Sequence, residues 1–182
     1  AARLSSGERN HEWQSDIADL ASPQWQQHLL ERAARLRSQG YRGLFLDTLD
    51  SFMRLPEERR PAQLQGLVAL LQRLHAEYPD LQLFFNRGFE ALPELGFAPA
   101  AVAVESLEAS WDQARGQYGR VSESDRAWLD GQLKPLLDAG TPVVAIEYLP
   151  PEQRDQAREL SQRLQQQGYL PVITTPELDS LG

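Results

Sequence analysis

Three times along this chain, a segment with a helical pattern ends at a glycine that is followed directly by an apolar run. The joins are Gly40-Tyr41, Gly140-Thr141 and Gly168-Tyr169. A glycine is a favoured helix C-cap because it adopts the left-handed backbone conformation without steric cost. This repetition predicts an α/β fold in which helical crossovers join parallel strands. No linker, repeat or low-complexity tract interrupts it, so we predict one domain over residues 1–182.

The apolar runs predict the strands of this fold. A short run at residues 2–6 precedes five clear ones, which span residues 43–47, 81–86, 100–105, 142–147 and 169–174. They are continuous rather than alternating, which is typical of strands buried on both faces of a parallel sheet. Helical patterns lie between them, at residues 22–39, 61–78, 122–139 and 151–167.

Two architectures share this alternation, the doubly wound sheet and the eight-stranded (β/α)8 TIM barrel. The chain contains neither a GxGxxG nor a GxxxxGK[ST] motif, which weakens the case for a nucleotide-binding doubly wound sheet. Six strands in 182 residues are few for a barrel, which typically takes about 250 residues. A barrel therefore requires that its first two strands are absent from this chain, and the pattern leaves both architectures open.

The composition argues against several classes of partner and cofactor. With 18 basic and 26 acidic residues the net charge is −8, which disfavours nucleic acid and anionic membranes as partners. No apolar run reaches the roughly 18–20 residues of a membrane-spanning helix. The chain has no cysteine, and its three histidines are His11, His28 and His75, two of them in helical patterns. We therefore expect no metal and no other cofactor.

Polar residues stand at the ends of four predicted strands: Asp47, Asn86, Glu105 and Glu147. In both parallel α/β architectures, ligands bind at the carboxyl ends of the strands. Two carboxylates that converge there could cleave a glycosidic bond, one by protonating the leaving oxygen and the other by attacking the anomeric carbon or activating water.

The polar and aromatic residues at and near these strand ends also have plainer interpretations. A single acidic residue after a strand is more often a helix N-cap or a solvated loop residue, and Asp50 is a good N-cap candidate. Tyr148 could bind substrate or simply pack over the rim of a barrel. Trp111 follows a strand end, where a sugar ring could stack on it. The pattern by itself does not decide between an enzyme and these alternatives.

Several segments resemble, in order along the chain, the endo-α-1,4-galactosaminidase-like glycoside hydrolases, in particular those of Pel exopolysaccharide biosynthesis. The segments are IADLASP (17–23), GYRGLFLDTLDSF (40–52), LFFNRGFE (83–90), AVAVES (101–106) and VAIEYLPP (144–151). The resemblance implies a (β/α)8 barrel that cleaves internal glycosidic bonds of a partly deacetylated polymer rich in α-1,4-linked N-acetylgalactosamine.

The same resemblance implies roles for individual residues. It places the nucleophile at Asp47 and the general acid/base at Glu105, in a retaining scheme. We predict that substrate is bound by Asp50, Asn86, Glu147, Tyr148, Trp111 and Glu8. The implied compartment is the periplasm, and the implied partners are other exopolysaccharide biosynthesis proteins and a downstream deacetylase domain.

The chain departs from the family pattern at its start. Residues 4–8 resemble the third strand of the family's barrel, so we expect the first two strands to be missing and the chain to be a fragment of a longer protein. An opened barrel exposes two sheet edges, which puts the activity of the isolated chain in doubt. The alternative function is a non-catalytic polysaccharide-binding or assembly module of an exopolysaccharide biosynthetic complex.

Overall fold

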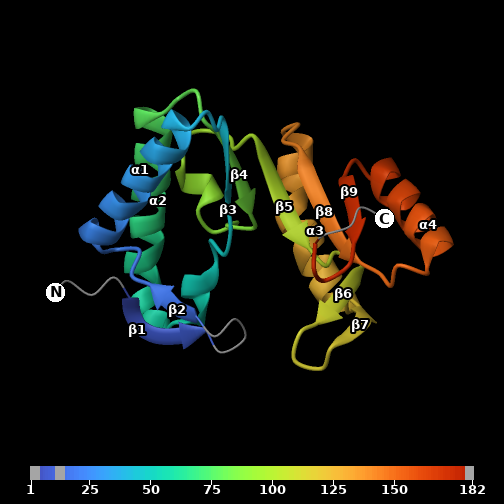
Figure 1. Cartoon of the computed structure of the whole chain (residues 1–182). Coiled ribbons are helices and arrows are strands. Elements are labelled where there is room, and N and C mark those ends of the chain that lie inside the picture. Colours follow the sequence, from blue (N-terminus) through green and yellow to red (C-terminus); the bar gives the residue numbers. More distant parts are fainter. Residues whose placement is uncertain (1–4, 11–14, 179–182) are drawn as a thin grey trace. The chain divides into compact units, whose positions relative to one another are not determined.

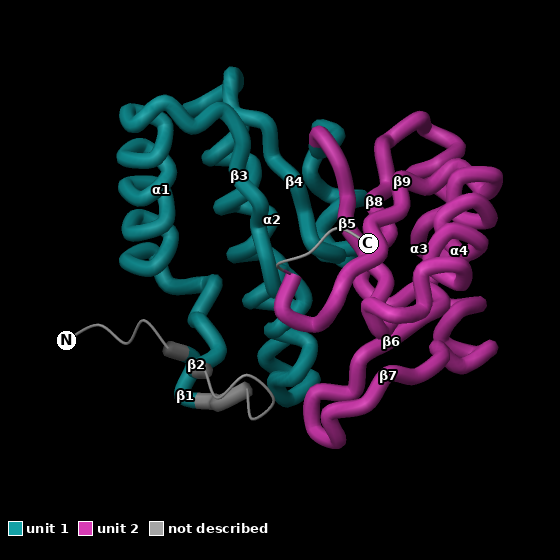
Figure 2. The backbone as a smooth tube through the Cα atoms, turned by 45° about the vertical axis from the view of Figure 1, so that its right-hand side comes forward, with its two compact units in different colours: residues 1–99 teal, residues 100–182 magenta. Residues whose placement is uncertain are grey.

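In the computed structural model the chain forms two compact units, Ala1–Pro99 and Ala100–Gly182, which Figure 2 distinguishes by colour. The structure describes residues 5–10 and 15–178. Each unit combines parallel strands with helices, as Figure 1 shows.

Unit 1 begins with an antiparallel hairpin and continues as a β/α alternation. Its helices and strands are β1 (Ser5–Asn10), β2 (Ser15–Ala18), α1 (Pro23–Ser38), β3 (Gly43–Leu46), α2 (Arg60–Glu77) and β4 (Gln82–Asn86), with 3-10 helices at Ser51–Arg54, Glu57–Arg59 and Leu92–Glu94. Strands β3 and β4 are parallel, with Phe45 opposite Phe84. The most deeply buried large side chains of this unit are Phe52, Leu55, Leu67, Leu71 and Phe85.

Helix α2 lies very close to the segment that leads into α1. The backbone of Leu20 and Ala21 comes so near to Gly66 that a Cβ atom there would clash with the carbonyl oxygen of Leu20. Gln63, which is buried, accepts a hydrogen bond from Leu20 N at 2.7 Å. Gln26 donates to the carbonyl oxygens of Leu20 and Gly66 at 2.9 and 3.1 Å. The close approach thus depends on a residue without a side chain, and two glutamines satisfy the polar backbone around it.

Unit 2 contains three parallel strands, two helices and a second hairpin. Its elements are β5 (Ala101–Glu105), β6 (Ala109–Asp112), β7 (Gln117–Arg120), α3 (Glu123–Asp138), β8 (Val143–Tyr148), α4 (Arg154–Gln166) and β9 (Leu170–Thr174). Strand β8 pairs in parallel with β5 and with β9. The hairpin β6–β7 is antiparallel and follows directly after the end of β5. The fully buried side chains of this unit include Val102, Val104, Leu107, Leu133, Val143 and Leu164.

The helix ends follow the sequence prediction closely. Gly40, Gly140 and Gly168 have φ angles of +100°, +75° and +93°, so each one ends a helix in the left-handed conformation that favours glycine. At the start of α1, Ser22 Oγ accepts a hydrogen bond from Trp25 N at 3.4 Å, and Pro23 occupies the first helical position.

The strands of the structure differ from the sequence prediction in three ways. Residues 5–10 pair with β2 in an antiparallel hairpin, so the prediction of a barrel strand at residues 4–8 is wrong for its described part. The hairpin β6–β7 is not predicted; the turn at Gly116, where φ is +62°, is the signal that could have indicated it. Finally, Phe45 and Phe84 are 55% and 37% exposed, because they lie on the face of β3 and β4 that α1 and α2 do not cover, whereas β5 is buried on both faces from Ala101 to Val104.

Candidate active site

Asp47 follows directly after β3, and one of its carboxylate oxygens accepts two hydrogen bonds. Thr48 N donates to Oδ1 at 2.7 Å, and Asn86 Nδ2 donates to the same atom at 2.8 Å. No described residue donates to Oδ2, and the side chain is exposed. The carboxylate is therefore held by one oxygen and presents the other to solvent.

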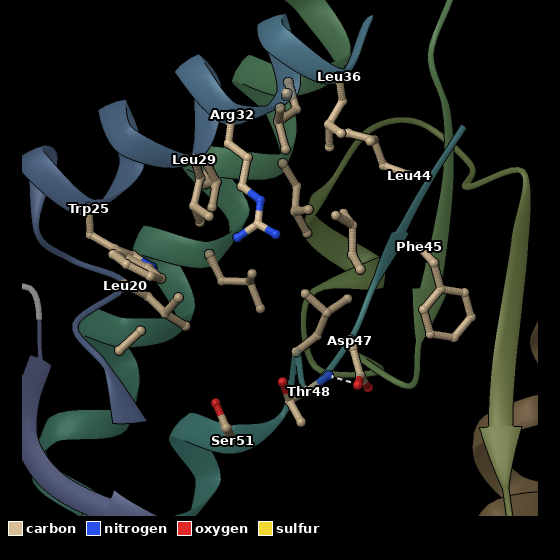
Figure 3. A pocket seen from close by; sticks show the side chains of 18 residues that line it. Leu20, Trp25, Leu29, Arg32, Leu36, Leu44, Phe45, Asp47, Thr48 and Ser51 are labelled. Carbon is tan, nitrogen blue, oxygen red and sulfur yellow. Dashed lines mark hydrogen bonds between the residues drawn. The ribbon is translucent and has the colours of Figure 1, made fainter. Parts of the chain in front are cut away.

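The register of β3 and β4 explains why Asn86 reaches Asp47. Because Phe45 lies opposite Phe84, the residues two positions further along the parallel strands, Asp47 and Asn86, stand side by side on the same face. Figure 3 shows Phe45 and Asp47 on the side of β3 turned away from the helices, whereas Leu44 points toward α1.

Glu105 ends β5 in unit 2 and is held by a tyrosine of the neighbouring strand. The hydroxyl of Tyr148 donates to Glu105 Oε2 at 2.6 Å. Glu105 lies opposite Ile146 in the register, so Tyr148 lies two residues further along β8 on the same face. Tyr148 is only 7% exposed, so its hydroxyl is held in place by the packing of its ring.

The residue that follows each of these strand ends adopts an unusual backbone conformation. Thr48, Arg87 and Ser106 have φ angles of +54°, +57° and +60°. Residues other than glycine rarely adopt positive φ, and for a β-branched threonine the conformation is strained. Such strain concentrates at functional sites, and here it recurs directly after Asp47, Asn86 and Glu105.

Glu147 is fully buried at the end of β8, with an exposed fraction of 0%. Its Oε1 accepts a hydrogen bond from Leu107 N at 3.0 Å, and its Oε2 accepts bonds from Glu108 N at 3.0 Å and Ala109 N at 2.5 Å. Burial raises the pKa of Glu147 above its ordinary value, although the three amide hydrogen bonds oppose this rise. These contacts favour a role inside the protein over the substrate contact that the sequence predicts, and sequence reasoning missed the amides of residues 107–109.

Glu108 holds the same loop from the outside. Its carboxylate accepts hydrogen bonds from Arg126 and Arg163, both at 2.9 Å. Partial burial by itself would raise the pKa of Glu108, but hydrogen bonds from Arg163 and Arg126 outweigh it and hold the pKa below its ordinary value. The segment after Glu105 is thus anchored by one carboxylate inside the unit and by two guanidinium groups near its surface.

The other residues predicted to bind substrate are Asp50, Trp111 and Glu8. Asp50 occupies the N-cap position of the 3-10 helix Ser51–Arg54, as expected, but its side chain makes no capping hydrogen bond. Trp111 lies in the β6–β7 hairpin, where its ring meets Tyr118 edge-on and its Nε1 donates to Gln113 at 2.8 Å. The side chain of Glu8 lies outside the described part of the structure.

A cavity of about 350 Å³ lies between β3 and helices α1 and α2, and its lining includes Phe45 and Asp47. Figure 3 shows its lining, in which leucines and Trp25 surround the side chain of Arg32. The indole Nε1 of Trp25 is buried without a hydrogen-bond partner among the described residues. A lining this apolar suits packing better than it suits a sugar polymer with many hydroxyl groups.

Within residues 5–10 and 15–178, no group of three or more His, Asp or Glu side chains is arranged to hold a metal ion. His11 lies outside these ranges. No described helix is both long and apolar enough to cross a membrane.

The sequence model of glycoside-hydrolase family GH114 matches residues 2–182. Among solved structures, the glycoside hydrolase domain of PelA from Pseudomonas aeruginosa is 57% identical, with a TM-score of 0.94 over 99% of this chain and 71% of that chain. A variant of the same domain is 56% identical, with a TM-score of 0.93. The predicted resemblance to this family of hydrolases is confirmed.

Two more distant similarities concern the fold and the length of the relatives. Aspergillus fumigatus Ega3, solved in complex with galactosamine, is 15% identical, with a TM-score of 0.63 over 96% of this chain and 66% of that chain, a likeness of fold alone. Together with the closer match, it confirms the predicted α/β fold of the TIM-barrel type. An uncharacterised protein of Deinococcus radiodurans is 26% identical over 163 residues, which are 87% of this chain and 51% of that protein. The chain thus spans about half the length of this curated relative.

Proposed function

Because the chain belongs to glycoside-hydrolase family GH114 and is a glycoside hydrolase, we propose that it cleaves the Pel exopolysaccharide from within the polymer. The proposed substrate is a partly deacetylated polymer rich in α-1,4-linked N-acetylgalactosamine and galactosamine. The 57% identity to the PelA hydrolase domain supports this choice. The net charge of −8 suits a polymer that carries free amino groups.

Asp47 and Glu105 are the proposed catalytic carboxylates. The observation that carries this assignment is that each stands at the carboxyl end of a parallel strand and is oriented by one side chain of the neighbouring strand, Asn86 in one case and Tyr148 in the other. A group held by its neighbours is preorganised for reaction, which lowers the cost of reaching the transition state.

The proposed reaction retains the anomeric configuration. Glu105 donates a proton to the glycosidic oxygen while Asp47 attacks the anomeric carbon, so the bond to the leaving sugar breaks and a glycosyl ester forms. Glu105 then takes a proton from water, which attacks the same carbon and releases Asp47. The open Oδ2 of Asp47 supports its role as the nucleophile, since the held Oδ1 keeps the carboxylate oriented.

The test is hydrolysis of partly deacetylated α-1,4-galactosaminan, with product sizes read by mass spectrometry and the anomeric configuration of new ends by proton NMR. We expect short oligomers of retained configuration from the wild type. Asp47→Asn and Glu105→Gln should each lower the rate about 10³-fold or more. The exposed carboxylates of Asp80 and Glu77 serve as controls through Asp80→Asn and Glu77→Gln, which should leave the rate unchanged.

Other outcomes would redirect the proposal. Inverted products would exclude Asp47 as a nucleophile and leave it as a base that activates water. Polymer binding without cleavage would favour the alternative of a non-catalytic binding or assembly module. The periplasm, a downstream deacetylase domain and protein partners in exopolysaccharide biosynthesis also belong to this proposal, and the family resemblance is their support.

A further inference from the structure

The backbone that follows Glu105 donates four consecutive amide hydrogen bonds to the end of β8. Ser106 N donates to the carbonyl oxygen of Ile146 at 2.9 Å. The next three amides, of residues 107–109, all donate to the carboxylate of Glu147, which leaves none of the four without a partner. Beyond the last backbone hydrogen bond between β5 and β8, the buried side chain of Glu147 therefore accepts the hydrogen bonds of the next three amides.

Holding a loop with a buried carboxylate requires the free energy of removing that charge from water. Removing a charged group from water is unfavourable unless hydrogen bonds replace the lost hydration. The carboxylate of Glu147 is completely enclosed and obtains this replacement from backbone amides of a single segment. The arrangement is therefore specific to one conformation of residues 106–109, because any other conformation would leave the charge without its donors.

Glu147 and Tyr148 act on the same residue from opposite sides of β8. Successive side chains of a strand point to opposite faces. Tyr148 contacts the carboxylate of Glu105 directly, whereas Glu147 holds the amides of residues 107–109, which come just after Ser106, where φ is +60°.

We propose that Glu147 is a positioning residue for the acid/base Glu105, acting through the amides of residues 107–109 and not through contact with substrate. This inference rests on the proposed function, since it presumes that Glu105 protonates the leaving group. Without the carboxylate of Glu147, the segment after Glu105 loses three of its four amide hydrogen bonds to β8, and the proton on Glu105 is no longer aimed at the glycosidic oxygen.

The test compares two substrates with the same sugar portion and different leaving groups. A sugar leaving group needs a proton from the acid, whereas a dinitrophenolate leaves without one. The measured quantity is kcat/KM, which reports the step in which the glycosidic bond breaks. We expect Glu147→Gln to lower kcat/KM about 10²-fold on the galactosamine oligomer, the loss typical of a misplaced catalytic group, and far less on its dinitrophenyl glycoside.

The matched control is Gln63→Leu in unit 1. Gln63 is also a buried polar side chain that binds a backbone amide, that of Leu20, but it has no part in the proposed chemistry. A loss of stability by itself would affect both substrates equally, so Gln63→Leu should leave their ratio of kcat/KM unchanged.

A second measurement does not depend on activity. Hydrogen exchange followed by NMR should be faster at the amides of residues 107–109 in Glu147→Gln than in the wild type and unchanged in Gln63→Leu. If Glu147→Gln does not fold, Glu147→Asp replaces it, since this variant keeps the charge but withdraws the oxygens by one methylene.

The outcomes separate this inference from the function on which it rests. A wild type that cleaves neither substrate contradicts the proposed function. A wild type that cleaves both, with a Glu147 variant that loses both activities equally or leaves the amide exchange unchanged, contradicts only the positioning role. Selective loss on the oligomer, together with faster exchange of the three amides, supports it.

Discussion

The side-chain amide of Asn86 donates a 2.8 Å hydrogen bond to Oδ1 of Asp47, although 39 residues separate them in the sequence. Asn86 is 8% exposed, so surrounding atoms hold its amide in place, whereas the carboxylate that it meets is open to solvent. A rigid donor beside an accessible acceptor is the arrangement expected for a nucleophile that must meet substrate in one orientation.

Replacing Asn86 with leucine tests this relationship. The variant keeps the size of the side chain and removes the donor. A hydrogen bond to a charged group contributes about 1.5–3 kcal/mol, so we expect kcat to fall roughly 10- to 100-fold with the fold retained. The check is steady-state hydrolysis alongside circular dichroism. Gln82→Leu, on the exposed part of the same strand, is the control, and equal effects of the two changes would argue against a role for Asn86.

Tyr148→Phe removes one hydroxyl next to Glu105. Because the ring is buried and its packing is retained, we expect the melting temperature to change little, while kcat/KM on the polymer falls about tenfold. Tyr118→Phe, in the hairpin β6–β7, is the control and should keep full activity. An unchanged rate in Tyr148→Phe would mean that its hydrogen bond to Glu105 does not contribute to catalysis.

The raised pKa of Glu147 predicts that the stability of the folded protein depends on pH. Its pKa is raised above 4.5 in the folded state, mainly by burial, so the folded protein holds this proton more tightly than the unfolded chain. The stabilisation is therefore complete below pH 4.5 and is lost as the pH rises through the folded-state pKa. We expect the free energy of unfolding of the wild type, relative to Glu147→Gln, to decrease over this interval in urea titrations. A relative stability that rises with pH would reverse the sign and contradict the prediction.

Two glycines in helices should respond oppositely to alanine. A Cβ at Gly66 would meet backbone atoms of Leu20 and Ala21 within 3.0 Å, so Gly66→Ala should destabilise unit 1 by about 1–3 kcal/mol. Beyond the backbone of its own helix, no described atom lies within 4 Å of a Cβ atom at Gly131 in α3, and Gly131→Ala should stabilise by about 0.5–1 kcal/mol. Urea unfolding of both variants measures the difference, and destabilisation by Gly131→Ala would count against this account of the helix.

Much of the fold could be predicted because its signals are local. The three glycines after helices and the apolar runs between them predict the β/α alternation, and the structure confirms it from Gly43 onward. The β1–β2 hairpin was missed because the residues that pair with each other there carry no continuous apolar pattern. The hairpin β6–β7 was missed because its strands are only four residues long.

By itself, the sequence determined that Asp47, Asn86, Glu105 and Glu147 lie at or next to the carboxyl ends of strands. Only the tertiary structure decided how these side chains differ. The register of neighbouring strands placed the hydrogen-bond donors Asn86 and Tyr148 beside Asp47 and Glu105. The side chain of Glu147 lies inside the protein, where it accepts hydrogen bonds from the amides of the loop after β5. The physical reason is range: helix and strand patterns arise from residues a few positions apart, whereas these hydrogen bonds join residues about 40 positions apart and exist only once the strands are paired.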